Sequence, residues 1–566
     1  MPLLRGKKRR TIVMTGPVAP KDPTEKRPGF YVLLDTQVGG TPQDDGRGRH
    51  SIYISSDRLP SFAQVTGGIK DPAILELLTG VTGFRKLVHS IGVSISGQDG
   101  MEVVFSLMCK GDGGPGSCHS FTFPADGAER VIDLEKLTWS EFDCGLGEFR
   151  FEMPTVADMA TVSVKCYVND GFSIPDQDPD PVVDMEGPKY REMIARSFLS
   201  AGNNERIQNF LRRAKAGEEV TVAFLGGSIT QGAGAVPLQE NCYARCAWEG
   251  LRQRYGQNIR YIKAGVGGTP SETGLMRYDR DITRDGRVQP DLVVIEFAVN
   301  DAGDETEGVF YESLVRHILK SPNRPAVILL FAVFANDWNL KRRLAPIGYR
   351  YQLPMVDVLE AVSPQFEAAD RVITKRQYFY DVYHPSNLGH KIMADCLLYL
   401  IDRLDAQQPE QEREDFVPPY YGRDYENLVL LDRKDSIPHA VITPGSFTGT
   451  DEDLQMVPLD DDHHNTPMFP HNWMKAAGNQ PFLLELTCRK LVLEFKDSGD
   501  DRFGKAMVTI DGEKQRILDP REAGWTHCHT TVLFNRQENA RHRIEITMAP
   551  GEEDKVFTIL GFGVVQ

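Results

Sequence analysis

The pattern of apolar and polar positions changes twice along the chain. Short apolar or alternating runs, separated by Gly, Asp and Pro, occupy residues 28–173 and return in residues 420–566, and this spacing is typical of β-strands. Between them, residues 189–405 alternate apolar runs with helical stretches. The predicted divisions are a tail at residues 1–27, a β-rich domain at 28–173, a linker at 174–188, an α/β domain at 189–405, a linker at 406–419 and a second β-rich domain at 420–566.

The middle region carries the pattern of a parallel sheet covered by helices. Its apolar runs, as expected of strands buried on both faces, lie at residues 220–225, 259–262, 292–297 and 326–334. Helical stretches lie at residues 242–255, 310–320 and 385–404. This alternation predicts a doubly wound α/β fold. For the flanking regions we predict a sandwich-like N-terminal domain and a jelly-roll or similar sandwich at the C-terminal side.

Composition narrows the classes of partner. The chain has 566 residues, too many for one hydrophobic core, and its 64 basic and 80 acidic side chains give a net charge of −16. Such an acidic surface repels nucleic acid and anionic membranes, and no run approaches the roughly 18 apolar residues of a membrane span. We therefore expect neutral small molecules or glycans as partners, with no nucleic acid and no membrane. Self-association into a homo-oligomer is left open.

The cysteines and the basic N-terminal residues bear on location. Nine cysteines, an odd number spread over the whole chain, are typical of free thiols in a reducing compartment, so we predict a cytoplasmic protein. Cys242 and Cys246 share a helix face and are interpreted as buried thiols. A basic cluster at residues 5–10 predicts a solvated tail rather than a localisation signal.

Four short sequence blocks contain the residue types of an acyl-transfer site. Gly226-Gly227-Ser228 follows a predicted strand, so the serine lies at the sheet edge where open α/β folds bind ligands. Two alternatives, a phosphate-binding turn and a simple helix N-cap, compete for this block. The P-loop lysine and the dinucleotide GxGxxG pattern are both missing here. We therefore favour Ser228 as a nucleophile.

The other blocks supply a base, an acid and hydrogen-bond donors. Asp381 precedes His384 by three residues, a separation that lets the carboxylate reach the imidazole Nδ1–H and leaves Nε2 for Ser228. Asn300 and the glycine turn containing Gly268 each follow a predicted strand and can donate to an oxyanion. Asn-Asp is also a common local turn. Metal binding by Asp381 and His384 lacks a third clustered ligand, so we expect neither a metal nor a cofactor.

Together these residues resemble the SGNH (GDSL-type) hydrolase superfamily. The blocks around Ser228, Gly268 and Asn300, and the Asp-x-x-His-Pro block, occur in family order over residues 189–405. The sequence departs from the family pattern at Lys263, where an asparagine is usual, and at Ala298, where a glycine is usual. The resemblance implies a flavodoxin-like α/β/α domain, metal-independent ester hydrolysis, a Ser228–His384–Asp381 triad, and an oxyanion hole formed by Ser228, Gly268 and Asn300.

The Gly-Gly-Ser-Ile-Thr variant and the flanking β-rich regions are similar to carbohydrate acetylesterases of this superfamily. The resemblance therefore implies a serine esterase that removes acetyl groups from oligosaccharides, such as xylan or mannan fragments. Trp338, Tyr378 and Tyr380 lie near the predicted site and are candidates for stacking on a sugar, although packing inside the fold is an equal alternative. Alternative functions are a lipid or thioester hydrolase on the same triad and a non-catalytic glycan-binding protein.

Two further clusters have the composition of metal sites. One is residues 460–464, with three aspartates and two histidines, and the other is His527-Cys528-His529. We interpret the first as a solvated loop and the second as a strand end.

Overall fold

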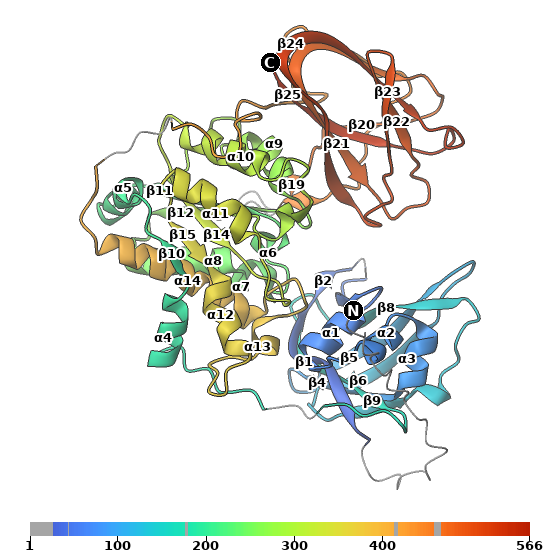
Figure 1. Ribbon diagram of the computed structural model, residues 1–566. Helices are drawn as coiled ribbons and strands as arrows, with labels where there is room; N and C mark the ends of the chain where they lie inside the picture. The colour runs from blue at the N-terminus through green and yellow to red at the C-terminus, as the bar shows by residue number, and fades with distance from the viewer. Residues whose placement is uncertain (1–26, 44, 176–178, 412–416, 458–465) are drawn as a thin grey trace, which may run out of the picture. The chain divides into compact units, whose positions relative to one another are not determined.

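The computed structural model in Figure 1 describes residues 27–43, 45–175, 179–411, 417–457 and 466–566. The chain forms two compact units, Met1–Asp180 and Pro181–Gln566. The central α/β part and the C-terminal β-rich part belong to the same unit, so the finer boundaries at residues 405 and 420 stay predictions. Among the described residues, no helix has both the length and the apolar character needed to cross a membrane.

The first unit consists mainly of two antiparallel sheets. One contains β1 (Gly29–Gly39), β9 (Met159–Val168), β4 (Val88–Ser96) and β7 (Arg130–Asp133), in that order; the other contains β2 (Thr41–Pro42), β3 (Gly48–Tyr53), β8 (Asp143–Met153), β5 (Glu102–Gly111) and β6 (Cys118–Pro124). Alternate residues of β8 and β9 are buried, as in sheets with one face on a core. Three short helices that the sequence pattern did not predict follow β3, namely α1 (Arg58–Val65), α2 (Pro72–Leu77) and α3 (Val81–Leu87).

The second unit contains the predicted doubly wound sheet. Its strand order is β10 (Phe198–Ser200), β15 (Met355–Asp357), β14 (Ala326–Phe331), β13 (Leu292–Glu296), β11 (Val220–Gly226) and β12 (Ile259–Gly265). All strands from β11 to β15 pair in parallel, and only β10 is antiparallel. The order of the parallel strands is that of flavodoxin-like folds, so the fold class is confirmed. The chain reverses its direction of winding between β11 and β13, which is where such folds bind ligands.

Helices cover both faces of this sheet (Figure 1). On one face, α8 (Tyr243–Tyr255) packs against α14 (Asn387–Asp405), and α5 (Glu205–Lys215) also contacts both. On the other face, α9 (Ser271–Asp281) packs against α10 (Val309–Leu319). All residues of β11, β13 and β14 are buried, which explains why these strands were visible in the sequence as continuous apolar runs.

The remaining helices and short turns complete the α/β part. They are α4 (Pro188–Ala195), α6 (Ser228–Gln231), α7 (Leu238–Asn241), η2 (Asn300–Gly303), α11 (Lys341–Arg350), α12 (Val358–Phe366) and α13 (Lys375–Tyr378). The helix α6 has only four residues, and it begins at the serine that the sequence singled out.

The C-terminal part forms one eight-stranded antiparallel sheet around an apolar core (Figure 1). Its strands are β16 (Val429–Leu431), β17 (Val441–Thr443), β20 (Trp473–Met474), β21 (Phe482–Asp497), β22 (Ala506–Ile510), β23 (Glu513–Leu518), β24 (His527–Met548) and β25 (Thr558–Val565), with a separate pair formed by β18 (Met456–Val457) and β19 (Thr466–Pro467). The pairing of the long strands β21 and β24 shifts register near Cys488, and the two strands pair on both sides of this irregularity.

A shared hydrophobic core joins this sheet to the α/β part. Leu275 and Leu314 of the helices α9 and α10 belong to the same buried cluster as Phe469, Val492 and Leu560 of the C-terminal part. Burial of such a continuous apolar surface is the main force that holds two regions together. Residues of the C-terminal sheet are therefore held in place beside α9 and the turn that precedes it.

Candidate active site

Two glycines place Ser228 at the carboxyl edge of the sheet. The chain leaves β11 at Gly226 and enters the short helix α6 at Ser228. A β-carbon on Gly226 would overlap Thr230 and the carbonyl oxygen of Glu296, and one on Gly227 would overlap the Asn300 side chain. Only glycine therefore allows the sharp turn that presents the Ser228 hydroxyl.

The structure brings Ser228, His384 and Asp381 into one hydrogen-bonded chain. Ser228 Oγ lies 2.9 Å from His384 Nε2, and His384 Nδ1 lies 2.9 Å from Asp381 Oδ2. The other oxygen of Asp381 accepts hydrogen bonds from the backbone N–H groups of Tyr383 and His384, both at 2.8 Å. Because Asp381 is buried and fully hydrogen-bonded, it fixes the orientation of the imidazole. The arrangement matches a serine nucleophile with its general base and orienting acid.

Three N–H groups beside Ser228 are available to a ligand. They are the backbone N–H groups of Ser228 and Gly268 and the side-chain amide of Asn300, at the ends of β11, β12 and β13 respectively. Within the described parts of the chain, no acceptor receives a hydrogen bond from any of the three. The Asn300 side chain lies directly against Gly227, which places its amide next to the serine turn. Donors that converge beside a nucleophile can bind the negative oxygen of a tetrahedral intermediate.

Three buried polar residues, Thr230, Tyr243 and Glu296, form hydrogen bonds beneath the turn that carries Ser228. Thr230, two residues after the serine, contacts the Tyr243 hydroxyl at 2.8 Å and donates to Glu296 Oε2 at 3.0 Å. Complete burial raises the pKa of Glu296 to about 8. The carboxyl group is therefore protonated at neutral pH, and no unpaired charge is held under the serine turn.

Two buried cations tie the loops of the site together, and the sequence pattern did not identify either role. Arg277 donates to the carbonyl oxygens of Gly226 at 3.0 Å and Ala264 at 2.8 Å, so it links the ends of β11 and β12. Lys263, at the position where the family usually has asparagine, donates to the Gln231 carbonyl oxygen at 2.8 Å. It therefore holds the last residue of α6. For Lys263, the signal in the sequence was a charged residue inside the otherwise apolar stretch at residues 261–265, whereas Arg277 lies among other charged residues and gave no such signal.

The three aromatic candidates for sugar stacking have different environments. Tyr378 is completely buried and packs edge-on against Phe379, so its assignment as a stacking residue is wrong. Tyr380 and Trp338 are half-buried. Tyr380 lies beside Gly234 in the loop after α6, and Trp338 contacts Phe334. These two residues stay candidates.

The C-terminal sheet contributes residues next to Gly268 that the sequence analysis did not place there. Trp525 and His527 both lie where they would touch a β-carbon added to Gly268, and Trp525 is 47% exposed. His527 Nδ1 lies 3.0 Å from Asp497 Oδ2, and His529 Nδ1 lies 3.1 Å from the same oxygen. The pair of histidines is thus oriented by a buried carboxylate. No local pattern predicts this contact, because it depends on how the two parts of the unit pack.

His527 and His529 do not belong to a metal site in the described part of the structure. Among the described residues, no group of three or more His, Cys, Asp or Glu side chains has the arrangement of a metal site. The cluster at residues 460–464 lies outside the described residues.

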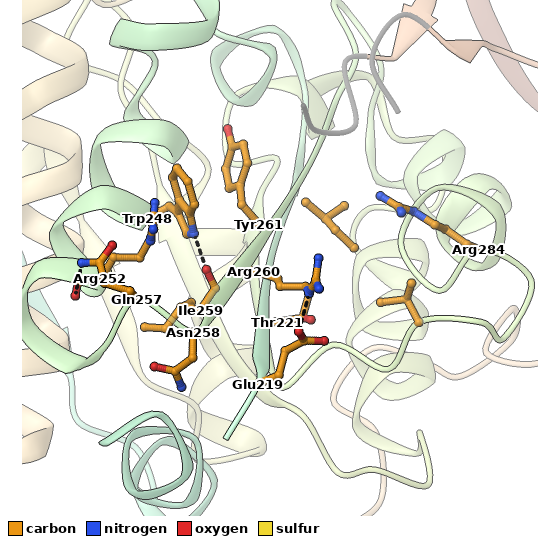
Figure 2. A pocket seen from close by; sticks show the side chains of 12 residues that line it. Glu219, Thr221, Trp248, Arg252, Gln257, Asn258, Ile259, Arg260, Tyr261 and Arg284 are labelled. Carbon is orange, nitrogen blue, oxygen red and sulfur yellow. Dashed lines mark hydrogen bonds and ion pairs between the residues drawn. The ribbon is translucent and has the colours of Figure 1, made fainter. Parts of the chain in front are cut away.

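A cavity of about 410 Å³ lies at the opposite end of β11 and β12 (Figure 2). Its wall includes Arg252, Arg260 and Arg284, and Arg260 forms an ion pair with Glu219 at 2.8 Å. The Trp248 indole N–H donates to a backbone oxygen at 2.8 Å. The lining contains no serine, cysteine or histidine, so it offers no nucleophile or base for acyl transfer. We therefore place the candidate active site at the carboxyl edge of the sheet.

Replacing Asn300 with alanine is expected to lower kcat on an acetate ester on the order of 10²- to 10³-fold, with little change in KM. The reason is that its amide is placed to bind charge that develops only in the transition state. Steady-state kinetics of Asn300→Ala and the isosteric Asn300→Asp test this, with thermal melting as the check on folding. An unchanged kcat would reduce Asn300 to a turn residue.

The stability of the protein is expected to fall as the pH rises toward and through 8, in part because of Glu296. The pKa of this carboxyl is about 4.3 in an unfolded chain but about 8 in the folded protein. Between these two pH values, the unfolded state has lost the proton and the folded state has kept it. The contribution of Glu296 to stability is therefore complete at acid pH and declines as the pH rises. Glu296→Gln, which cannot ionise, should show a shallower loss of Tm between pH 6 and 9. The surface substitution Glu249→Gln is the control, and parallel curves for all three proteins would contradict the argument.

Comparison with known proteins agrees with this geometry. Residues 224–392 match the family described as the GDSL-like Lipase/Acylhydrolase family. No curated protein matched the chain. The structure is similar to that of a two-domain esterase (CEX) active on acetylated mannans, with 27% identity and a TM-score of 0.58 over 66% of this chain and 99% of that chain. A structure of such an esterase co-crystallised with mannopentaose has 26% identity and a TM-score of 0.57, over 66% of this chain and 98% of that chain.

These similarities support ester hydrolysis by the central domain. The family match covers the end of the strand that leads to Ser228, the turns of Gly268 and Asn300, and the Asp381–His384 block. The resemblance noted in the sequence is therefore confirmed at the level of the family.

Proposed function

We propose that this chain, whose central domain belongs to the GDSL-like lipase/acylhydrolase family, is a serine esterase that removes acetyl groups from oligosaccharides. The observation that carries the proposal is the hydrogen-bonded chain from Ser228 through His384 to Asp381. It stands at the carboxyl edge of the sheet next to three N–H groups without protein acceptors among the described residues. This combination is what acyl transfer to a serine requires.

In the first half of the reaction, Ser228 Oγ attacks the acetyl carbonyl carbon while His384 Nε2 removes the hydroxyl proton. The carbonyl oxygen becomes negative and is held by the N–H groups of Ser228 and Gly268 and by the Asn300 amide. When the intermediate collapses, the imidazolium of His384 gives its proton to the sugar oxygen, which leaves as a hydroxyl group. Asp381 stabilises the imidazolium while it exists.

In the second half, water takes the place of the sugar hydroxyl. His384 removes a proton from the water, which attacks the acetyl-serine carbonyl and forms a second oxyanion at the same three donors. Collapse of this intermediate returns the proton to Ser228 Oγ and releases acetate. No step of the proposed reaction needs a metal or a cofactor.

Several features favour a glycan over a lipid as the substrate. The similar two-domain esterase acts on acetylated mannans, which supports mannan fragments ahead of xylan fragments for this chain. The exposed indole of Trp525 beside Gly268 can stack on a sugar ring. Residues 231–236, the loop after the nucleophile, contain mostly Gly and Ala and offer little apolar lining for a long acyl chain. The net charge of −16 also disfavours an anionic lipid surface.

Mass spectrometry of acetylated oligosaccharides tests this proposal directly. Acetylated manno- and xylo-oligosaccharides incubated with the protein should lose acetyl groups stepwise, the manno-oligosaccharides faster. In parallel, chromogenic acetate should be cleaved well and octanoate hardly at all, because overpacking a small pocket costs roughly 1–3 kcal/mol, about 5- to 150-fold in rate. A preference for octanoate would replace the proposal with a lipid or thioester hydrolase. Binding of the oligosaccharides with no ester cleavage would instead indicate a glycan-binding protein.

The cellular setting of this activity stays a prediction. We propose a cytoplasmic enzyme acting on imported oligosaccharides, without nucleic acid or membrane partners, and self-association is still open. Fractionation of native cells and size measurement of the purified protein address both points.

A further inference from the structure

A single glutamine from the C-terminal part contacts the peptide bond that carries one of the oxyanion donors. Gln455 Nε2 donates to the Gly267 carbonyl oxygen at 2.9 Å. Its Oε1 accepts from the backbone N–H of Cys528 in β24 at 2.9 Å. The backbone oxygen of Gln455 also accepts from Met468 N at 2.7 Å. Both ends of the side-chain amide are therefore satisfied, and the side chain is held in one orientation.

The contact matters because the Gly267 carbonyl and the Gly268 N–H, one of the oxyanion donors, belong to one planar peptide unit. The Gly267 C=O and the Gly268 N–H belong to the same peptide unit, and in a trans peptide they point in opposite directions. A hydrogen bond that fixes the oxygen on the Gln455 side therefore fixes the N–H on the opposite side. Rotation of this peptide would take the donor away from the site and could turn the carbonyl oxygen toward it, where it would repel an oxyanion.

The turn has little resistance of its own to such a rotation. Two consecutive glycines form it, and Gly268 has φ of +73°, a conformation that glycine adopts at little cost. Within the described residues, the Gly268 N–H has no protein acceptor that would hold it in place. The orientation of the donor thus depends on groups that contact the other side of the turn.

Other contacts from the C-terminal sheet act on the same segment. The His527 ring, oriented by Asp497, lies beside Gly268, where it would touch a β-carbon added to that residue. In α9, the helix that follows the turn, the Thr273 hydroxyl contacts Thr530 Oγ1 at 2.7 Å and donates to Glu494 Oε1 at 3.1 Å. These contacts position the segment, but among the described residues only Gln455 bonds to the peptide unit itself.

We infer that Gln455 is a positioning residue for catalysis, which locks the Gly267–Gly268 peptide with its N–H directed toward the oxyanion. The inference rests on the proposed function for its catalytic consequence, but not for the peptide orientation. It assigns the C-terminal part a role in the chemical step, separate from any contact with the glycan. The α/β domain holds the nucleophile, the base and the oxyanion donors, and the C-terminal part fixes the orientation of one of these donors.

The kinetic test compares Gln455→Ala with Gln455→Glu on a small chromogenic acetate, which does not extend to a distant glycan-binding surface. Loss of one oxyanion donor costs on the order of 10²- to 10³-fold in kcat, so a donor that is misoriented part of the time should cost about 10- to 100-fold. KM should change less than about twofold, because the interaction acts on the transition state. The glutamate variant still accepts from Cys528 but presents an oxygen to the Gly267 oxygen, so it should be at least as slow as the alanine variant.

The matched control is Gln566→Ala. The Gln566 amide also donates to a backbone oxygen in the C-terminal sheet, that of Thr487 at 3.1 Å, but it is exposed and belongs to another part of the fold. This variant should retain wild-type kcat and KM. If kcat falls with KM unchanged for Gln455→Ala, while both constants stay at wild-type values for Gln566→Ala, the effect is one of positioning and not of a general loss of a hydrogen bond.

A crystal structure of Gln455→Ala decides the inference independently of activity. We expect the Gly267–Gly268 peptide to be flipped or to occupy two orientations, with the triad distances unchanged. A peptide that keeps its wild-type orientation would overturn the inference, whatever happens to kcat. If the wild-type protein cleaves no acetate ester, the proposed function fails, and the orientation of the peptide in the variant still tests the role of Gln455.

Discussion

Ser228→Ala is expected to lower turnover of an acetate ester on the order of 10⁴-fold or more while leaving the fold intact. In the proposed mechanism this hydroxyl forms the acetyl-enzyme, and it lies 2.9 Å from His384 Nε2, the proposed base. Removing one oxygen leaves a small gap at a half-buried position and breaks no backbone hydrogen bond. Steady-state rates with chromogenic acetate, together with a thermal melt, measure both halves of the expectation.

The matched control for this substitution is Ser321→Ala. Ser321 follows α10 just before β14 begins, at the edge of the sheet opposite to the site, so its loss should leave turnover unchanged. Retention of more than about a tenth of the activity by Ser228→Ala would exclude Ser228 as the nucleophile, because triad nucleophiles contribute far more than that. Mass spectrometry of the protein after brief exposure to substrate should show an acetyl adduct that the variant cannot form.

The central sheet could be predicted because its strands are buried on both faces. Residues of β11, β13 and β14 form continuous apolar runs, and the turns that follow them carry glycine or Asn-Asp. In a parallel sheet the carboxyl ends of neighbouring strands lie side by side, so residues far apart in sequence were expected to meet. The meeting of Ser228 with His384 required one further element, the loop before α14, which its own hydrogen bonds to Asp381 make rigid.

Contacts that depend on packing between regions were not predictable in the same way. Gln455 and His527 reach the Gly267–Gly268 turn only because the C-terminal sheet shares a core with α9 and α10. Neither residue has a local pattern that marks it. A glutamine between an aspartate-rich segment and a short strand has many equivalents on any protein surface, and its role follows from the single carbonyl oxygen that it bonds.

The roles of two buried charged residues could not be interpreted from the sequence alone. Lys263 and Arg277 are both completely buried; Lys263 bonds to the backbone oxygen of Gln231, at the end of α6, and Arg277 bonds to backbone oxygens at the ends of β11 and β12. The sequence showed Lys263 only as a departure from the family pattern. The opposite error concerned Tyr378, whose position near the Asp-x-x-His block suggested a binding role although its ring packs entirely inside the fold. A residue close in sequence to a catalytic loop can face either the core or the site, and the sequence does not tell which.

Asp381→Asn is expected to reduce kcat by about 10⁴-fold with the fold retained. In the wild-type protein, Asp381 Oδ2 accepts from His384 Nδ1, so Nε2 is left without a proton and can take the one on Ser228. An asparagine can keep its oxygen on the N–H groups of Tyr383 and His384, where Asp381 Oδ1 now accepts both, and this would turn its NH₂ group toward Nδ1. The imidazole would then carry its proton on Nε2, where it can no longer act as the base.

This mechanism predicts a difference between two substitutions of the same residue. Asp381→Asn keeps the loop hydrogen bonds, so its Tm should stay close to that of the wild-type protein, whereas Asp381→Ala loses two hydrogen bonds to a buried acceptor, each worth about 0.5–1.5 kcal/mol, and should melt at a lower temperature. Both variants should nevertheless be similarly slow, because both lack the group that selects the imidazole tautomer. Kinetics and melting curves of the two proteins are the measurement. If Asp381→Asn retained near wild-type turnover, the carboxylate would serve only to shape the loop, and another group would have to orient His384.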